Sequence, residues 1–193
     1  MTVKLTVLAS GRGSNFGAIL DAIERGELDA RVTALISDQP DAPALARAQA
    51  AGIPTLVQSC RKADKPAFEQ AVTEQVQQSG SDLIILAGFM RLLSADFVER
   101  HAGRILNIHP SLLPSFKGLD APAQAVEAGV KISGCTVHVV TADMDAGPII
   151  AQAAVPVQEG DTADTLAARI LVEEHRLFPA AIETYSRQLL VGA

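Results

Sequence analysis

The chain has 193 residues, of which 48% are hydrophobic and 20% charged, and this composition excludes a disordered tail and favours one compact domain over residues 1–193. Only 4% of the residues are aromatic and tryptophan is absent, which is too few for base-stacking platforms. A formal net charge of −6 argues against a surface built for nucleic acid or anionic membranes, but it is compatible with a small phosphorylated ligand, which needs only local donors.

Short apolar, β-branched runs alternate with segments of helical period along the first half of the chain. Strands are expected at residues 3–9, 32–37, 53–57, 83–87 and 104–108. The helices between them are expected from about Phe16 to Gly26, from Asp41 to Gly52, from Asp64 to Gly80 and, capped by Ser94, as far as Gly103.

Beyond Gly129 the alternation changes. Residues 133–141 and 148–157 are expected to form two further strands of mixed direction, and a last helix begins near Thr162 and is interrupted near Pro179. Strands with few polar residues that alternate with helices predict a parallel sheet covered on both faces. The fold class expected is therefore α/β, in three layers, with a doubly wound, mostly parallel sheet and a mixed C-terminal part.

The start of the chain and its cysteines bear on where the protein works. Residues 1–8 read as a strand and lack the apolar core and cleavage site of a signal peptide. The longest strongly apolar run, residues 83–90, is far shorter than the roughly 20 residues of a membrane helix. Cys60 and Cys135 offer neither a disulfide framework nor zinc spacing. We therefore expect a cytoplasmic protein with reduced cysteines.

Ligands of open α/β sheets bind outside the carboxyl ends of the strands, and residues 10–15 (Ser-Gly-Arg-Gly-Ser-Asn) follow the first strand. The glycines allow a tight turn, and the free N–H groups of a helix start form an anion site. Phe16 stands where a dinucleotide fingerprint has its third glycine, and the Gly-Lys-Ser/Thr of a P-loop is absent. Two interpretations fit: a phosphate site, or an ordinary turn in which Ser14 or Asn15 caps the helix.

Residues 87–93 (Ala-Gly-Phe-Met-Arg-Leu-Leu) follow the fourth strand. Phe89, Met90 and Leu92 fit a flat apolar pocket with Arg91 at its mouth, and they fit equally well a core contact under the next helix. From the pattern alone, the core contact is the simpler interpretation.

Asn107 and His109, near the end of the fifth strand, face the same way because side chains alternate along a strand. Pro110 keeps His109 extended and ends the strand. The amide of Asn107 can donate to a carbonyl oxygen, and an imidazole can move protons near neutral pH. A lone buried histidine is usually structural, but this pair at a strand exit favours catalysis.

Two carboxylates complete the candidates. Asp145, in the turn between the two late strands, either orients an imidazole or is a solvated turn residue; a metal site at Asp143 and Asp145 lacks further ligands. Glu174 continues the four-residue spacing of Leu166 and Ile170, so it falls on the apolar face of the last helix. There it needs a partner, either an arginine of the chain, which is the simpler choice, or a cationic or hydroxylated ligand.

Four segments resemble the phosphoribosylglycinamide formyltransferase family in order and spacing: residues 11–15, residues 86–91, residues 107–114 (Asn-Ile-His-Pro-Ser-Leu-Leu-Pro) and residues 143–148. The resemblance extends essentially from end to end. It implies a single formyltransferase domain of residues 1–193. It also implies transfer of a formyl group from the co-substrate 10-formyltetrahydrofolate to the amine of glycinamide ribonucleotide in de novo purine biosynthesis, by direct attack through a tetrahedral intermediate and without a metal.

The resemblance also implies roles for individual residues and partners. The partners would be the two small molecules alone, without nucleic acid or membrane, and the protein would be a monomer or homodimer. Relatives commonly have histidines after Gly118-Leu119, where this chain has Asp-Ala-Pro-Ala-Gln, so no ribonucleotide contact is assigned to residues 120–124. By likeness the catalytic residues would be Asn107, His109 and Asp145, the ribonucleotide would contact Gly13, Ser14, Asn15 and Glu174, and the folate would contact Lys65, Met90, Arg91, Leu92, Leu93 and Asn107.

Three other functions are weighed against this one. A 10-formyltetrahydrofolate hydrolase, which uses water as the acceptor, has an extra N-terminal domain that we do not expect where the first strand begins at Val3. A methionyl-tRNA formyltransferase has an additional C-terminal domain, and the acidic chain disfavours tRNA. A non-catalytic nucleotide-binding module would explain the glycine loop but not Asn107, His109 and Asp145 together.

Overall fold

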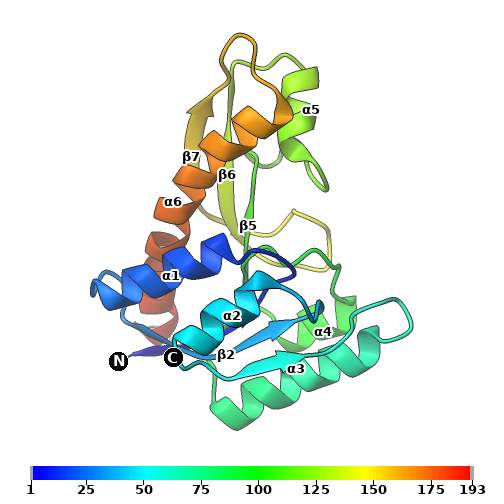
Figure 1. The fold of residues 1–193 in the computed structure, drawn as a ribbon, viewed down its shortest axis with the longest axis vertical. Helices are drawn as coiled ribbons and strands as arrows, with labels where there is room; N and C mark the ends of the chain where they lie inside the picture. The colour runs from blue at the N-terminus through cyan, green and yellow to red at the C-terminus, as the bar shows by residue number, and fades with distance from the viewer. Residues whose placement is uncertain (1, 192–193) are drawn as a thin grey trace.

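Seven strands and six helices make up residues 2–191, the part of the chain that the computed structural model describes (Figure 1). The order along the chain is β1 (Val3–Leu8), α1 (Ser14–Glu24), β2 (Ala30–Ser37), α2 (Pro43–Ala50), β3 (Thr55–Val57), α3 (Lys65–Ser79), β4 (Leu83–Leu86), α4 (Ala95–Arg100), β5 (Ile105–His109), α5 (Ala121–Glu127), β6 (Ile132–Val139), β7 (Ile149–Pro156) and α6 (Ala163–Val191).

The strands form one sheet with the order β3-β2-β1-β4-β5-β6-β7. Strands β1 to β5 pair in parallel, whereas β6 runs antiparallel to β5, and β7 antiparallel to β6. The predicted class, a mostly parallel sheet with a mixed C-terminal part, is therefore confirmed.

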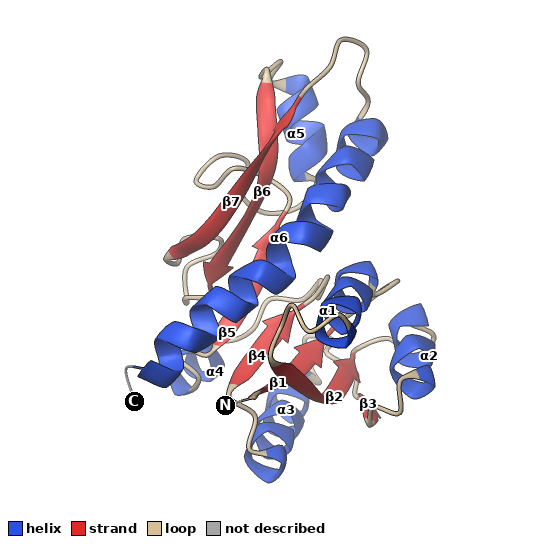
Figure 2. Ribbon diagram, turned by 90° about the vertical axis from the view of Figure 1, so that its left-hand side faces the viewer, coloured by secondary structure: helices blue, strands red, loops and turns tan. Residues whose placement is uncertain are grey.

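Helices cover both faces of the sheet, as the continuous apolar strands predict (Figure 2). One core cluster joins apolar side chains of α1, α2, α5 and α6 to one face, with Phe16, Leu45 and Phe178 among its buried members. The other joins α3 and α4 to the opposite face through Phe68 and Phe97, both of which are almost completely buried. The result is the expected three layers.

Two helices differ from expectation. Helix α6 continues through Pro179, where the sequence predicts an interruption. Proline removes one backbone hydrogen bond of a helix, but Phe178, Ala181 and Ile182 are buried around it, and this packing favours an unbroken helix. Helix α5 is an addition to the expected elements; it begins after Asp120, which adopts a left-handed conformation (φ 55°).

The strand order reverses at β1, which lies between β2 and β4. The parallel strands β1, β2, β4 and β5 all point toward the part of the molecule that contains β6, β7 and α5 (Figure 2). The loops after β1 and β4 therefore meet at one edge, where the backbone N–H of Ser10 donates to the carbonyl of Gly88 (3.1 Å). This is the edge at which ligands of doubly wound folds bind. None of the helices in residues 2–191 combines the length and apolarity that a membrane crossing requires.

Candidate functional site

Helix α1 begins at this edge without a side-chain cap. Its N-cap is Gly13, in the left-handed region (φ 66°), and a Cβ atom on Gly13 would lie 2.6 Å from the Cβ atom of Ala44 on α2. The expectation that Ser14 or Asn15 caps the helix is wrong, since both are already inside it. The first N–H groups of a helix have no intrahelical partner, so the N–H groups of Ser14 and Asn15 are placed to bind an anion.

The buried Glu174 of α6 is the partner of Asn15. The Asn15 Nδ2 group donates to Glu174 Oε2 over 2.8 Å, so the partner is a neutral amide and not the arginine that periodicity favoured. Burial raises the pKa of the Glu174 carboxyl above its ordinary value, although the Asn15 amide and the nearby His109 oppose this rise. Within the described chain, Asn15 Oδ1 is buried without a hydrogen-bond partner. These two side chains thus form a polar floor beside the start of α1.

Asn107 lies opposite a second histidine. In the β5–β6 pairing its register partner is His138, and Asn107 Nδ2 lies 3.2 Å from His138 Nε2. His138 Nδ1 lies 3.1 Å from the carbonyl oxygen of Val139 and therefore donates to it, which leaves Nε2 to accept from the Asn107 amide. Burial lowers the pKa of the His138 imidazole, in accord with a neutral ring. His138 thus fixes the orientation of the Asn107 amide.

His109 lies between a backbone carbonyl and a carboxylate. Its Nε2 atom is 2.8 Å from the carbonyl oxygen of Phe116, and its Nδ1 atom is 3.5 Å from Asp145 Oδ2. The same Asp145 Oδ2 accepts from the N–H of Gly118 over 2.8 Å, and Asp145 Oδ1 lies 3.7 Å from His138 Nε2. Asp145 holds this position with φ 48°, a conformation that costs a non-glycine residue free energy and is typical of functional sites.

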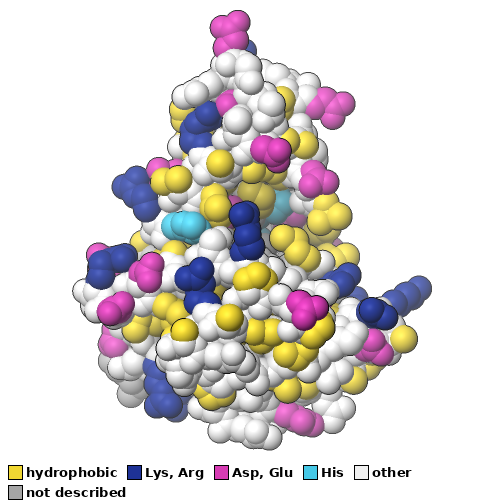
Figure 3. Space-filling view, viewed as in Figure 1, with side chains coloured by type: hydrophobic (Ala, Val, Ile, Leu, Met, Phe, Trp, Pro, Cys, Tyr) yellow, Lys and Arg dark blue, Asp and Glu magenta, His cyan; other side chains and the backbone are white. Residues whose placement is uncertain are grey.

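The three residues expected to be catalytic therefore lie together at the carboxyl end of β5. Asn107 is half-buried, His109 is buried and Asp145 is half-buried. The Asn15–Glu174 pair lies at the start of α1, which follows β1, and the cluster lies at the carboxyl end of β5 on the same edge of the parallel sheet. On the face shown in Figure 3, histidine, arginine and lysine side chains lie among hydrophobic ones across the middle of the molecule, between its narrow upper part and its broad lower part.

The segment after β4 has an exposed apolar surface beside this cluster. Met90 is 67% exposed and Leu92 66% exposed, while Phe89 is buried and stacks on Phe68 with ring centroids 5.3 Å apart. Leu93 is half-buried. The interpretation as a core contact is therefore confirmed for Phe89 and wrong for Met90 and Leu92, which are exposed; that these two line an apolar pocket stays a prediction.

Arg91 and Lys65 lie on the outer side of this segment. Arg91 Nε donates to Asp38 Oδ2 over 2.7 Å. Lys65, the first residue of α3, is half-buried. Burial raises the pKa of the Cys60 thiol. Asp38 and Arg91 line one cavity together with Asp64, the residue that precedes Lys65, so Lys65 begins α3 beside this cavity. Within residues 2–191, neither Lys65 nor Arg91 forms a hydrogen bond with Asn107, His109 or Asp145.

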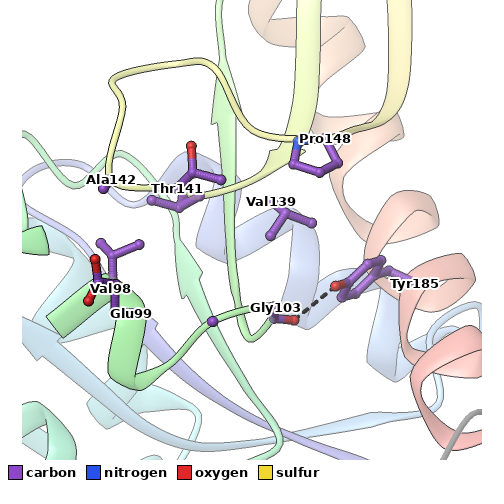
Figure 4. Close-up of a pocket in the computed structure, with 10 residues that line it drawn as sticks. Val98, Glu99, Gly103, Val139, Thr141, Ala142, Pro148 and Tyr185 are labelled. Carbon is purple, nitrogen blue, oxygen red and sulfur yellow. Dashed lines mark hydrogen bonds between the residues drawn. The ribbon is translucent and has the colours of Figure 1, made fainter. Parts of the chain in front are cut away.

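Two cavities lie outside the catalytic cluster. One, of about 430 Å³, is bounded by Val98, Gly103, Val139, Pro148 and Tyr185, and the Tyr185 hydroxyl donates to the Gly103 carbonyl over 2.9 Å (Figure 4). It lies at the opposite end of β5 from the cluster. The other, of about 470 Å³, lies against Asp38, Arg61 and Arg91 at the carboxyl ends of β2 and β4. In the described part of the chain, no three His, Cys, Asp or Glu side chains gather as metal ligands.

Two residues of this region were missed by the sequence reasoning. His138 could have been found, since it lies in an expected strand, but its contact with Asn107 depends on the antiparallel register of β5 and β6. Asp38 directly follows β2, at the edge of the sheet where ligands bind, and this position could have indicated a functional residue.

Comparison with known proteins adds independent information. The family model described as formyl transferase matches residues 3–182. Phosphoribosylglycinamide formyltransferase of Bacillus subtilis is 45% identical over 181 residues, which cover 93% of each chain. The trifunctional purine biosynthetic protein adenosine-3 of Bos taurus is also 45% identical over 181 residues, but this chain spans only 18% of its length.

Solved structures show the same relationship. Glycinamide ribonucleotide transformylase 1 from Symbiobacterium toebii has a TM-score of 0.91 at 48% identity, covering 97% of this chain and 89% of that one. A formyltetrahydrofolate deformylase from Pseudomonas putida has a TM-score of 0.87 at 32% identity, covering 97% of this chain and 66% of that one. Because the family match and the identity extend over almost the whole sequence, this chain belongs to the formyl transferase family.

Proposed function

We propose that this chain transfers a formyl group from 10-formyltetrahydrofolate to the amine of glycinamide ribonucleotide in purine biosynthesis. The observation on which this depends is the cluster of Asn107, His109 and Asp145 at the end of β5, near the uncapped start of α1. The 45% identity to the Bacillus subtilis phosphoribosylglycinamide formyltransferase supports this acceptor.

The ribonucleotide would bind at the start of α1. The N–H groups of Ser14 and Asn15 suit a phosphate, which the positive end of the helix dipole also favours. Asn15 Oδ1, buried and without a partner in residues 2–191, suits a hydroxyl or amine donor, and the adjacent Glu174 carboxyl accepts from the same kinds of group. The polar floor therefore fits the sugar and the amine of the substrate.

The folate would bind along the segment after β4. The exposed side chains of Met90 and Leu92, with the half-buried Leu93, provide an apolar surface for a flat ring system. Arg91 uses its Nε group for Asp38, which leaves its two terminal amino groups for a ligand carboxylate. Lys65, at the start of α3, supplies a further positive charge beside the cavity that Arg91 lines.

The catalytic cluster fits the charges that develop when the amine attacks the formyl carbon. Asn107 has one amide N–H directed to His138, and its other N–H can donate to the formyl oxygen. A well-placed donor of this kind contributes about 3 kcal/mol to stabilising an oxyanion. His138 fixes the amide so that this donor is held in place before the reaction begins.

His109 is placed to move the proton. With Nε2–H directed to the carbonyl of Phe116, a neutral ring has its lone pair on Nδ1, which faces Asp145. Because Nδ1 faces Asp145, a proton taken from the attacking nitrogen would pass by way of this carboxylate to Nδ1, and Asp145 would then stabilise the positive charge of the imidazolium that forms. The imidazolium can then return the proton to the departing folate nitrogen. No bond between the enzyme and the formyl carbon is needed.

Purified protein mixed with 10-formyltetrahydrofolate, with and without glycinamide ribonucleotide, tests the proposal by the product formed. Formylated ribonucleotide, formed only when both substrates are present, is the expected result. The similarity to the Pseudomonas putida deformylase makes hydrolysis the second candidate, and release of formate at an equal rate without the ribonucleotide would establish it instead. The absence of both products would contradict formyl chemistry altogether.

The broader assignments are part of the same proposal. We infer that residues 1–193 act as a single formyltransferase domain in the cytoplasm, as a monomer or homodimer. Its partners would be the two substrates, without nucleic acid; the net charge of −6 supports this last point. Size-exclusion chromatography with light scattering would determine the oligomeric state.

A further inference from the structure

A buried carboxylate lies between the two loops that the proposed function assigns to the two substrates. Asp38 follows β2 directly, and its side chain is 0% exposed. Its Oδ2 atom accepts from Arg91 Nε over 2.7 Å and from Gln39 Nε2 over 2.8 Å. A carboxylate that is fully removed from water is costly unless donors surround it, so the loop after β4 and Asp38 depend on each other.

Ser10, in the loop after β1, connects to the same carboxylate. Burial alone would raise the pKa of the Asp38 carboxyl, but its interactions with Ser10, Arg91 and Gln39 outweigh burial and lower it. The hydrogen bonds to Asp38 come from Arg91 and Gln39 and go to Oδ2, while Oδ1 is buried without a hydrogen-bond partner in the described residues. The Ser10 hydroxyl oxygen in turn accepts from the N–H of Met90 over 2.9 Å, and the Ser10 N–H donates to the carbonyl of Gly88. Asp38 is thus hydrogen-bonded to the loop after β4 through Arg91. Ser10, three residues before Gly13, joins that loop to the loop after β1 through its bonds with Gly88 and Met90.

We propose that Asp38 is a positioning residue that couples the ribonucleotide loop, residues 10–15, to the folate loop, residues 88–93. This inference rests on the proposed function. Asp38 borders the cavity beside Arg61 and Arg91, but its side chain has no exposed surface, so we expect it to act through Ser10 and Arg91 and not by binding a ligand itself. Because hydrogen bonds to a charged acceptor are about twice as strong as neutral ones, the carboxylate holds both loops in the geometry that each ligand requires.

The substitution Asp38→Asn tests the coupling, because it keeps the size of the side chain and removes the charge. We expect KM to rise about 3- to 10-fold for both substrates, with kcat within about twofold of wild type, since interactions that hold both ground and transition states change KM alone. If Asp38 served only the overall stability of the fold, Asp38→Asn would change the melting temperature and leave both KM values unchanged at temperatures below it. A rise in KM for one substrate alone would contradict coupling.

Hydrogen exchange of the free protein gives a second readout that needs no substrate. The N–H groups of Ser10 and Met90 should exchange at least about tenfold faster in Asp38→Asn, whereas core amides of β1 should not. Asp41→Asn is the matched control, because Asp41 is exposed, lies three residues away and loses the same charge. Equal exchange rates in Asp38→Asn and Asp41→Asn would overturn the proposal.

A double-mutant cycle identifies the route. If Asp38 acts through Ser10, the effects of Asp38→Asn and Ser10→Ala on the exchange of the Met90 N–H should be less than additive. Full additivity would show that the two residues act independently and would contradict the coupling. Failure of wild-type protein to form formylated ribonucleotide would overturn the proposed function, and the exchange experiment would still report on the link between the loops.

Discussion

Replacing Gly13 by alanine perturbs the start of α1 in a way that the structure quantifies. Gly13 has φ 66°, and a left-handed conformation costs a non-glycine residue roughly 1–2 kcal/mol. The added Cβ would lie 2.6 Å from the Ala44 Cβ and 3.0 Å from the Ala44 Cα, and such overpacking costs about 1–3 kcal/mol. The sum, about 3 kcal/mol, corresponds to a fall in melting temperature of about 6–12 °C for a chain of this size.

The same substitution moves the N–H groups of Ser14 and Asn15. Steady-state kinetics below the melting temperature should therefore show a KM for the ribonucleotide at least about tenfold higher, with a smaller change for the folate. Gly11→Ala is the matched control, since no atom lies within 4 Å of its added Cβ, and we expect its stability to change by less than about 0.5 kcal/mol. If Gly13→Ala matched Gly11→Ala in stability and in ribonucleotide KM, the anion site at α1 would be refuted.

Three further predictions concern Glu174, the histidines and Leu92. Burial raises the pKa of the Glu174 carboxyl, because the charged form is costly there, so Glu174→Gln should raise the melting temperature by about 2–4 °C. The KM for the ribonucleotide should increase in the same variant. A lower melting temperature would contradict the first effect. Burial lowers the pKa of His101 and of His138. At a pH between these lowered pKa values and the ordinary value of 6.5, the unfolded chain therefore binds more protons than the folded chain. The contribution of the two neutral histidines to stability is complete above pH 6.5 and is lost as the pH falls. Chemical denaturation from pH 7 to pH 5 should show this loss, and His101→Gln should reduce it; a pH-independent midpoint would argue against it. Leu92→Ala, at a 66% exposed position, should raise the folate KM and leave the melting temperature unchanged, and an unaltered folate KM would exclude Leu92 from the folate surface.

The local patterns of the sequence predict most of the strands and helices because burial repeats with the period of each element. The spacing of Leu166, Ile170 and Glu174 correctly predicts that the carboxyl is buried. The same spacing does not identify its partner, because Asn15 is 159 residues away and meets Glu174 only when α1 packs on α6. Pairings between distant elements are therefore the part of the site that pattern reasoning leaves open.

Backbone geometry and strand register explain the remaining differences. Ser14 has the chemistry of a cap, but Ala44 packs so closely on Gly13 that the glycine becomes the N-cap and the helix starts one residue earlier than a Ser14 cap would allow. The role of His138 depends on its lying opposite Asn107, which follows from the antiparallel register of β5 and β6. Neither contact has a signal in the composition or periodicity of its own segment.

The turnover number of the His109→Ala protein, measured at saturating concentrations of both substrates, tests the central claim most directly. If His109 carries the proton and Asp145 stabilises the resulting imidazolium, kcat should fall at least about a hundredfold while the melting temperature stays that of the wild type. Asp145→Ala should lower kcat by a factor of the same order. A correctly folded His109→Ala protein that forms formylated ribonucleotide at the wild-type rate would contradict the account.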